Sequence, residues 1–488
     1  MTSFREIREA RLAAERGTIF GQADLSVALC YPSPYNVGMS SLGFQTMYRE
    51  LNALPGISAE RAFLPDDVAS ARKAREELCT YESNRPLANF PVVAFSLAYE
   101  LELAGLVHCL DLAGIPALAA ERDHGARRWP LVVIGGPLPF SNPVPAGPMA
   151  DVIIMGEAEE AIGTFMRAFR ESADKRALLE SLARLPGFFI PLVHGENPPA
   201  VLAASNARLP AYSQIVTPHT ELSDMFLIEA ARGCSRTCTY CVMRRSTNGG
   251  MRKVEPDQIL PKIPEHVRRV GLVGAAVTDH PRLPAILRAL IDSGRSIGVS
   301  SLRADRLNDE LVGLLAAGGY RTLTTASDGT SQHMRDEIRR GTSEENLRNA
   351  ARLCRAHRMK ALKLYMMLGL PGETMDDVDE LGRFALELAA IAPRLVITVA
   401  PFVAKRNTPL DRSPFESIAV LDTRLAQLRT SLRGRVKLMG ESPKWAWVEY
   451  QLAQGGFRQG LATIAAARNG GSYAAWKSAL NAEPAEPA

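Results

Sequence analysis

Short apolar runs alternate with amphipathic stretches along most of this 488-residue chain. In the first part, short and mainly apolar strand-like runs occur at residues 26–30, 91–96, 131–135 and 151–155. A strand that is apolar throughout is buried on both faces, and such strands separated by helices form a parallel sheet covered by helices. The pattern therefore predicts an α/β fold that begins with a doubly wound, Rossmann-like domain.

The alternation resumes in the second part of the chain. Strand-like runs are expected at residues 225–230, 270–274, 297–301, 320–325, 360–367 and 395–400. Helical stretches lie between them, for example at 344–357 and 376–390. Six consecutive β/α units predict a partial (β/α)6 barrel, whose functional site belongs at the carboxyl ends of the strands.

The domain boundaries follow from changes in these patterns. We expect a charged N-terminal helix within residues 1–20, the Rossmann-like domain at 21–196, and a proline-containing linker at 197–221. The barrel is expected at 222–432. Residues 433–488, which contain three of the four tryptophans, are expected to form a small C-terminal element and tail.

Charge and hydropathy narrow the possible partners. Lys and Arg number 57 against 53 Asp and Glu, so the chain lacks the basic excess typical of proteins that bind nucleic acid. No apolar stretch approaches the ~20 residues of a membrane span, and the charged N-terminus does not resemble a secretory signal. We therefore expect a cytoplasmic protein without a membrane span. In that reducing compartment, clustered cysteines bind metal more often than they form disulfides.

Three of the seven cysteines are clustered, at Cys234, Cys238 and Cys241. They directly follow the first strand of the second domain. The C-x3-C-x2-C spacing lets one short loop place three thiolates on one face of an iron–sulfur cubane, leaving the fourth iron open. A structural zinc site, with Cys354 or a distant histidine as fourth ligand, is the alternative. It would make the protein a non-catalytic binding module.

The segment Arg-Gly-Cys-Ser-Arg-Thr-Cys-Thr-Tyr-Cys at 232–241 resembles the signature of the radical S-adenosylmethionine (SAM) superfamily. The resemblance implies a 4Fe-4S cluster bound by Cys234, Cys238 and Cys241, the catalytic and metal-binding residues. It also implies that the amino and carboxylate groups of SAM chelate the open iron. Reductive cleavage of SAM would then give a 5′-deoxyadenosyl radical that abstracts a hydrogen from the substrate.

Segments farther along the chain agree with this resemblance in order. Residues 273–276 stand where the family has a Gly-Gly-Glu motif, although Ala276 replaces the acidic residue. The Gly-Leu-Pro-Gly segment starting at residue 369 resembles the family's turn beside the adenine. The resemblance implies that the following residues contact SAM: Tyr240, Gly274, Ala275, Ser301, Arg303, Asp328 and Gly369.

The first domain resembles the cobalamin-binding-type domain that precedes the barrel in one radical SAM subgroup. The resemblance rests on residues 31–43, 95–100, 134–143 and 156–160. It implies a methyltransferase that uses cobalamin to methylate an unactivated carbon. The Asp-x-His-x-x-Gly loop of many cobalamin proteins is absent, since Asp123-His124-Gly125 has a different spacing. A domain that has lost its cobalamin and serves as a lid or substrate domain therefore remains an alternative.

Another possible function is that of a radical SAM enzyme without cobalamin, such as a methylthiotransferase. Those enzymes usually carry a second cysteine triad in the N-terminal domain, whereas Cys30, Cys79 and Cys109 are widely separated. These three, like Cys354, are expected to be small buried residues. The expected partners are a small-molecule or peptide substrate and an electron donor such as flavodoxin or ferredoxin. Nucleic acid is not expected.

Overall fold

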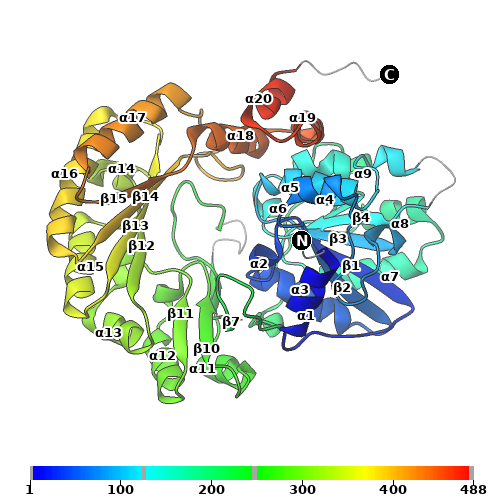
Figure 1. The fold of residues 1–488 in the computed structure, drawn as a ribbon, viewed down its shortest axis with the longest axis horizontal. Helices are drawn as coiled ribbons and strands as arrows, with labels where there is room; N and C mark the ends of the chain where they lie inside the picture. The colour runs from blue at the N-terminus through cyan, green and yellow to red at the C-terminus, as the bar shows by residue number, and fades with distance from the viewer. Residues whose placement is uncertain (1–3, 124–127, 244–249, 483–488) are drawn as a thin grey trace. The chain divides into compact units, whose positions relative to one another are not determined.

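The computed structural model describes residues 4–123, 128–243 and 250–482, and the chain divides into two compact units (Figure 1). The Rossmann-like unit comprises residues 1–224 and 451–488, and the barrel unit comprises residues 225–450. Within the described ranges, none of the helices has the length and apolar character that crossing a membrane requires.

The Rossmann-like unit is built on a six-stranded sheet of order β2-β1-β3-β4-β5-β6. Its strands are β1 (Leu25–Tyr31), β2 (Ile57–Phe63), β3 (Val92–Ser96), β4 (Leu131–Gly135), β5 (Val152–Ile154) and β6 (Phe188–Phe189). All neighbouring pairs are parallel except β5 and β6. The order 2-1-3-4-5 is that of a doubly wound fold, whose ligands bind where β1 and β3 lie side by side. The predicted α/β class is confirmed.

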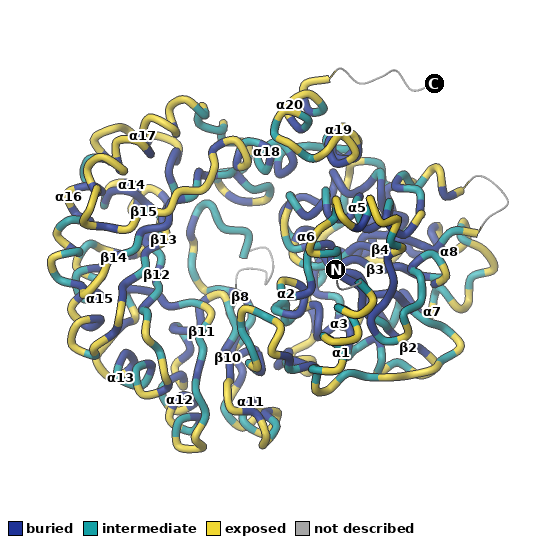
Figure 2. The backbone as a smooth tube through the Cα atoms, in the orientation of Figure 1, coloured by how far each residue is buried: buried dark blue, intermediate teal, exposed yellow. Residues whose placement is uncertain are grey.

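Helices cover both faces of this sheet, as the burial of its central strands requires (Figure 2). Alternate residues of β1, such as Val27 and Leu29, share a core with α3 (Leu42–Asn52) and α7 (Ala161–Glu171). Cys30, which follows Leu29 in the strand, contacts Cys109 of α5 (Glu102–Leu112) on the other face. Successive side chains of a strand point to opposite faces, so each face of the sheet requires its own layer of helices.

The N-terminal segment also belongs to this unit. The expected first helix is α1 (Phe4–Ala13). Residues 197–221, expected to be a linker, lie within the unit, where Ile215 is buried in the core. Thr217 hydrogen-bonds the hydroxyl of Tyr35, with 3.1 Å between the oxygens.

The C-terminal segment is divided between the two units. Strand β15 (Lys437–Gly440) joins a sheet of the barrel unit, whereas α19 (Phe457–Arg468) and α20 (Tyr473–Asn481) belong to the Rossmann-like unit. The Asn142 amide donates to three carbonyls at the end of α18 (Pro443–Gln454), those of residues 452, 453 and 455 at 3.3, 3.0 and 2.8 Å. Residues 483–488 lie outside the described part. The single element expected at 433–488 is therefore two structural parts.

The barrel unit contains two parallel sheets, of order β11-β10-β7 and β12-β13-β14-β15. Its further strands are β7 (Met225–Glu229), β10 (Arg269–Val273), β11 (Ser296–Val299), β12 (Thr322–Asp328), β13 (Ala361–Leu368) and β14 (Leu395–Pro401). The helices between them are α12 (Leu283–Asp292), α13 (Asp309–Ala317), α15 (Glu344–Ala356), α16 (Met375–Ile391) and α17 (Ile418–Ser431). Within the described residues the two sheets do not close into one ring, as expected for a partial barrel.

Candidate active site

The cysteine loop follows β7 and the short strand β8 (Ala231–Gly233), which pairs with β9 (Met251–Lys253). Cys238 is buried, whereas Cys234 and Cys241 are partly exposed. The backbone of Thr239 fixes the middle of the loop: its N–H donates to the carbonyl of Ile338 at 3.1 Å, and its carbonyl accepts from the N–H of Leu410 at 3.2 Å. The thiols are therefore carried on a loop that is held from both sides.

The three thiols of this loop lie within electrostatic range of one another. Burial raises the pKa of the Cys241 thiol, and the neighbouring thiols of Cys238 and Cys234 raise it further. Within the described ranges, no three His, Cys, Asp or Glu side chains converge on a point as ligands of a single metal ion do. A four-iron cluster requires less convergence, because each thiolate binds a different iron. The donor set fits a cluster with three thiolate ligands.

Tyr240 and Asp328 meet beside the thiols. The Tyr240 hydroxyl donates to Oδ2 of Asp328 at 2.5 Å, and Nε of Arg340 lies 2.7 Å from the same oxygen. Arg340 also lies within electrostatic range of the Cys238 thiol. Burial, together with the Asp328 carboxylate, raises the pKa of Tyr240, so its hydroxyl remains a proton donor. The sequence predicted both Tyr240 and Asp328 as site residues but did not identify Arg340.

The segment after β10 is held by two serines of the segment after β11. The Ser300 and Ser301 hydroxyls both donate to the carbonyl of Gly274, at 2.9 and 3.0 Å, and Ser301 accepts from the N–H of Val277 at 3.2 Å. A Cβ at Gly274 would lie 2.6 Å from the carbonyl oxygen of Ala231, so only glycine fits there. Ala275 is exposed at the tip of this segment. Ser301 thus positions the backbone around Gly274.

Arg303 lies in an ion-pair network that includes the cysteine loop. Its Nη2 lies 3.0 Å from Asp305, and its Nε lies 3.8 Å from Asp279. Arg236, between the first two cysteines, donates to both oxygens of Asp279 at 3.1 and 3.2 Å and to Asp305 at 3.0 Å. Burial raises the pKa of Asp279, but the positive charges of Arg236, Arg303 and Arg306 lower it below its ordinary value. The sequence analysis did not identify Arg236. Its position between Cys234 and Cys238 was the feature that could have marked it as a site residue.

Replacing Arg236 with Gln is expected to accelerate loss of iron from the protein. The substitution removes the ion pairs that fix the loop between Cys234 and Cys238, and comparable supporting contacts change metal affinity by about 10- to 100-fold. The measurement is the rate at which a chelator removes iron under anaerobic conditions. Arg306→Gln is the matched control, because Arg306 contacts Asp279 at 3.0 Å from outside the loop. Equal rates for both variants would show that Arg236 does not anchor the loop.

The predicted turn at Gly369 follows β13 and is held by a buried carboxylate. Glu373 accepts from the Gly369 N–H and the Thr330 hydroxyl, both at 2.6 Å, and from Arg424 at 3.0 Å. Gly369 has a φ of 84°, and a Cβ there would lie 2.7 Å from the Leu421 side chain. The turn is thus rigid, and its glycine is required by conformation and by packing.

In the Rossmann-like unit, the loops that resemble a cobalamin site follow β1, β3 and β4. Between β1 and β3, the buried Glu102 accepts from the Ser33 hydroxyl at 3.0 Å and from the N–H of Ala98 at 2.6 Å. Burial raises the pKa of Glu102. His124 lies outside the described residues. The edge at which a doubly wound sheet binds ligands is therefore lined by a buried carboxyl group.

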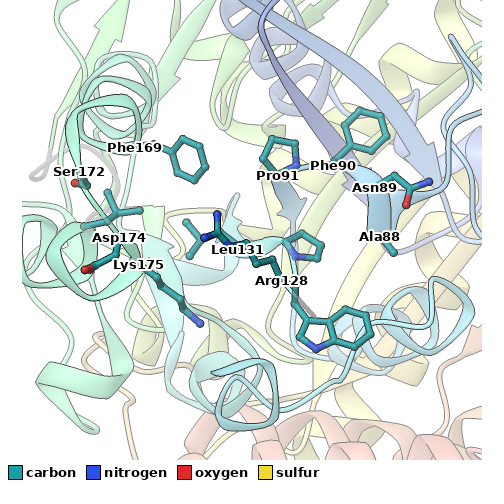
Figure 3. A pocket seen from close by; sticks show the side chains of 13 residues that line it. Ala88, Asn89, Phe90, Pro91, Arg128, Leu131, Phe169, Ser172, Asp174 and Lys175 are labelled. Atoms are coloured by element: carbon teal, nitrogen blue, oxygen red, sulfur yellow. The ribbon is translucent and has the colours of Figure 1, made fainter. Parts of the chain in front are cut away.

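A cavity of about 470 Å³ lies at the opposite edge of this sheet. It is lined by Pro91 and Leu131, at the amino ends of β3 and β4, and by Phe90, Phe169 and Lys175 (Figure 3). This cavity is distinct from the loops on which the resemblance to cobalamin proteins rests.

Comparison with known proteins agrees with this arrangement. The profile "Radical SAM proteins, N-terminal" matches residues 43–191, and "Radical SAM superfamily" matches residues 228–385. An uncharacterized protein of Methanocaldococcus jannaschii, MJ0966, is 25% identical over 400 residues, which cover 80% of each chain. The ribosomal protein uS12 methylthiotransferase RimO of Clostridioides difficile is 28% identical over 232 residues, 43% of this chain and 48% of RimO.

Among solved structures, the chain is similar to OxsB, a cobalamin-dependent SAM radical enzyme with aqua-cobalamin bound. The TM-score is 0.53 at 14% identity, over 83% of this chain and 56% of OxsB. At this identity the likeness shows a shared fold. The chain spans about half the length of RimO and of OxsB.

Proposed function

Because the chain belongs to the radical SAM superfamily, we propose that it cleaves SAM reductively at a 4Fe-4S cluster bound by Cys234, Cys238 and Cys241. The observation that carries the proposal is the placement of these three free thiols on one loop, which backbone hydrogen bonds of Thr239 hold from both sides. When bound, the cluster supplies one electron to SAM, whose cleavage gives methionine and the 5′-deoxyadenosyl radical.

The surrounding residues are proposed to hold SAM and the cysteine loop in place. The backbone at Gly274 and Ala275 would receive the methionine part of SAM, and the turn at Gly369 would lie beside the adenine. Ser301 and Arg303 are engaged with Gly274 and Asp305, so we propose that they act by positioning these segments. Such pre-organisation lowers the cost of aligning the reacting groups.

The proposed overall reaction is cobalamin-dependent methyl transfer to an unactivated carbon. The fold shared with OxsB supports it, as do the loops at residues 31–43 and 135–145 beside the junction of β1 and β3. The proposed location is the cytoplasm. The proposed partners are a small-molecule or peptide substrate and flavodoxin or ferredoxin as electron donor. The near-neutral net charge of +4 gives no support for a nucleic-acid substrate.

A methylthiotransferase reaction is the second candidate, because RimO proteins from several bacteria match part of the chain. That reaction would call for further cluster ligands in the Rossmann-like unit. Its three cysteines, Cys30, Cys79 and Cys109, are buried on separate elements, and Cys30 and Cys109 pack against each other in the core. The packing of these thiols therefore favours methyl transfer.

Metal analysis of anaerobically purified protein, produced with hydroxocobalamin, tests the proposal. We expect about four irons per chain, stoichiometric cobalt, and 5′-deoxyadenosine after addition of SAM and dithionite. Iron without cobalt, with SAM cleavage retained, would contradict the cobalamin-dependent reaction and favour the second candidate. Zinc without iron would contradict the enzyme altogether and favour a zinc-stabilised binding module.

A further inference from the structure

We propose that Arg340 sets the reduction potential of the cluster by holding its positive charge beside the thiolate of Cys238, next to Asp328 and Tyr240. This inference rests on the proposed function and adds a role for a residue outside the cysteine motif. Arg340 lies 99 positions after Cys241, in a different β/α unit of the barrel.

The guanidinium of Arg340 is held in place by the protein. Its Nε lies 2.7 Å from Asp328 Oδ2, and its Nη2 donates to the carbonyl of Ala326 at 3.2 Å. The side chain is 12% exposed and lies within electrostatic range of the Cys238 thiol. Its own carbonyl accepts from Arg303 Nη2 at 3.4 Å. The positive charge is therefore fixed beside a cluster ligand and largely shielded from water.

Asp328, which orients Arg340, lies on an unusually constrained segment. Its φ is 64°, and the pairing of β12 with β13 shifts register at this point. The neighbouring Ser327 and Gly329 are both contacted by Nη1 of the buried Arg335, at 3.3 and 3.5 Å. Asp adopts the left-handed region more readily than most non-glycine residues, and here its carboxylate is engaged by both Arg340 and Tyr240. The carboxylate is therefore held in one orientation toward Arg340 and Tyr240.

A fixed positive charge beside a thiolate affects the two oxidation states of the cluster unequally. One-electron reduction adds negative charge to the cluster and its sulfur ligands, so a nearby positive charge stabilises the reduced state more than the oxidised state. Hydrogen bonds to the sulfurs are among the factors that set such potentials. Burial strengthens the interaction because little water screens it. Arg340 therefore raises the potential and makes the cluster easier for a donor to reduce.

The test is a redox titration of reconstituted protein, in which the electron paramagnetic resonance signal reports the reduced cluster. Arg340→Gln is expected to keep its iron and sulfide but to titrate at a more negative potential. Arg340→Lys, which keeps the charge but loses the forked geometry, is expected to fall between Arg340→Gln and the wild type. Arg339→Gln, at the adjacent exposed residue, is the matched control and is expected to titrate as the wild type does.

A second variant gives a shift of the opposite sign. Asp328→Asn removes the negative charge that balances Arg340, so its potential is expected to become more positive than that of the wild type. Equal potentials for Arg340→Gln and the wild type, at full cluster content, would overturn the inference. If Arg340→Gln loses its cluster, the absence of a positive shift in Asp328→Asn would overturn it. Failure of the wild type to bind a cluster would instead contradict the proposed function.

Discussion

Replacing Cys234, Cys238 and Cys241 together with alanine is expected to remove the bound iron and abolish cleavage of SAM. Each thiolate binds a different iron of the proposed cluster, and no other cysteine of the chain belongs to this loop. Without the cluster no electron reaches SAM, so the loss is complete rather than partial. Iron and sulfide analysis and the yield of 5′-deoxyadenosine in the presence of dithionite measure the effect.

The matched controls are Cys79→Ala and Cys354→Ala, which remove buried thiols remote in sequence from the cysteine loop. Burial raises the pKa of both thiols, to about 11 for Cys354, as expected of unreactive packing residues. Both variants are expected to keep iron and activity. Cleavage of SAM by the triple variant would contradict the mechanism, and loss of iron in Cys354→Ala would instead support a metal site that includes this residue.

Arg61→Met is expected to lower the stability of the Rossmann-like unit by about 3–5 kcal/mol. Arg61 of β2 is fully buried and pairs with two buried carboxylates, Glu15 at 2.7 Å and Glu82 at 2.7 Å. Methionine fills a similar volume but leaves both carboxylates without a cation. Hydrogen exchange of the amides in β1, β2 and β3 measures the opening free energy of the sheet.

The defect of Arg61→Met is expected to depend on pH. Burial raises the pKa of Glu82 above the ordinary value of 4.5, and Arg61 opposes this rise. Removing Arg61 raises the folded-state pKa further. The variant therefore loses stability as the pH rises from 4.5 through that raised pKa, and its defect shrinks as the pH falls.

Arg176→Gln is the control for the Arg61 variant, because Arg176 forms an exposed ion pair with Glu180 in α8 (Lys175–Leu182). Exposed pairs contribute little to stability, because water and salt screen them. If Arg61→Met lost no more stability than Arg176→Gln, other groups would have to balance the charges of Glu15 and Glu82.

Strand β2 shows why the sequence pattern missed an element of the predicted sheet. It carries Glu60 and Arg61 in its middle, so it does not form an apolar run, although Arg61 is buried. Its charge is compensated by Glu15 and Glu82, which lie elsewhere in the chain. Strand β15 was missed for another reason: it is largely exposed and therefore carries no continuous apolar signal.

The sequence by itself determined the α/β class, the alternation of strands and helices in the two domains, and the cysteine motif. These features are local. Both the burial of a strand on its two faces and the spacing of ligands within a loop depend only on residues that are neighbours in the sequence. Only the tertiary structure decided that Arg340 lies beside Asp328 and the cysteine loop, and that Arg236 reaches Asp279 and Asp305. Such partners come from different β/α units, and they meet because parallel strands bring their carboxyl ends to one edge.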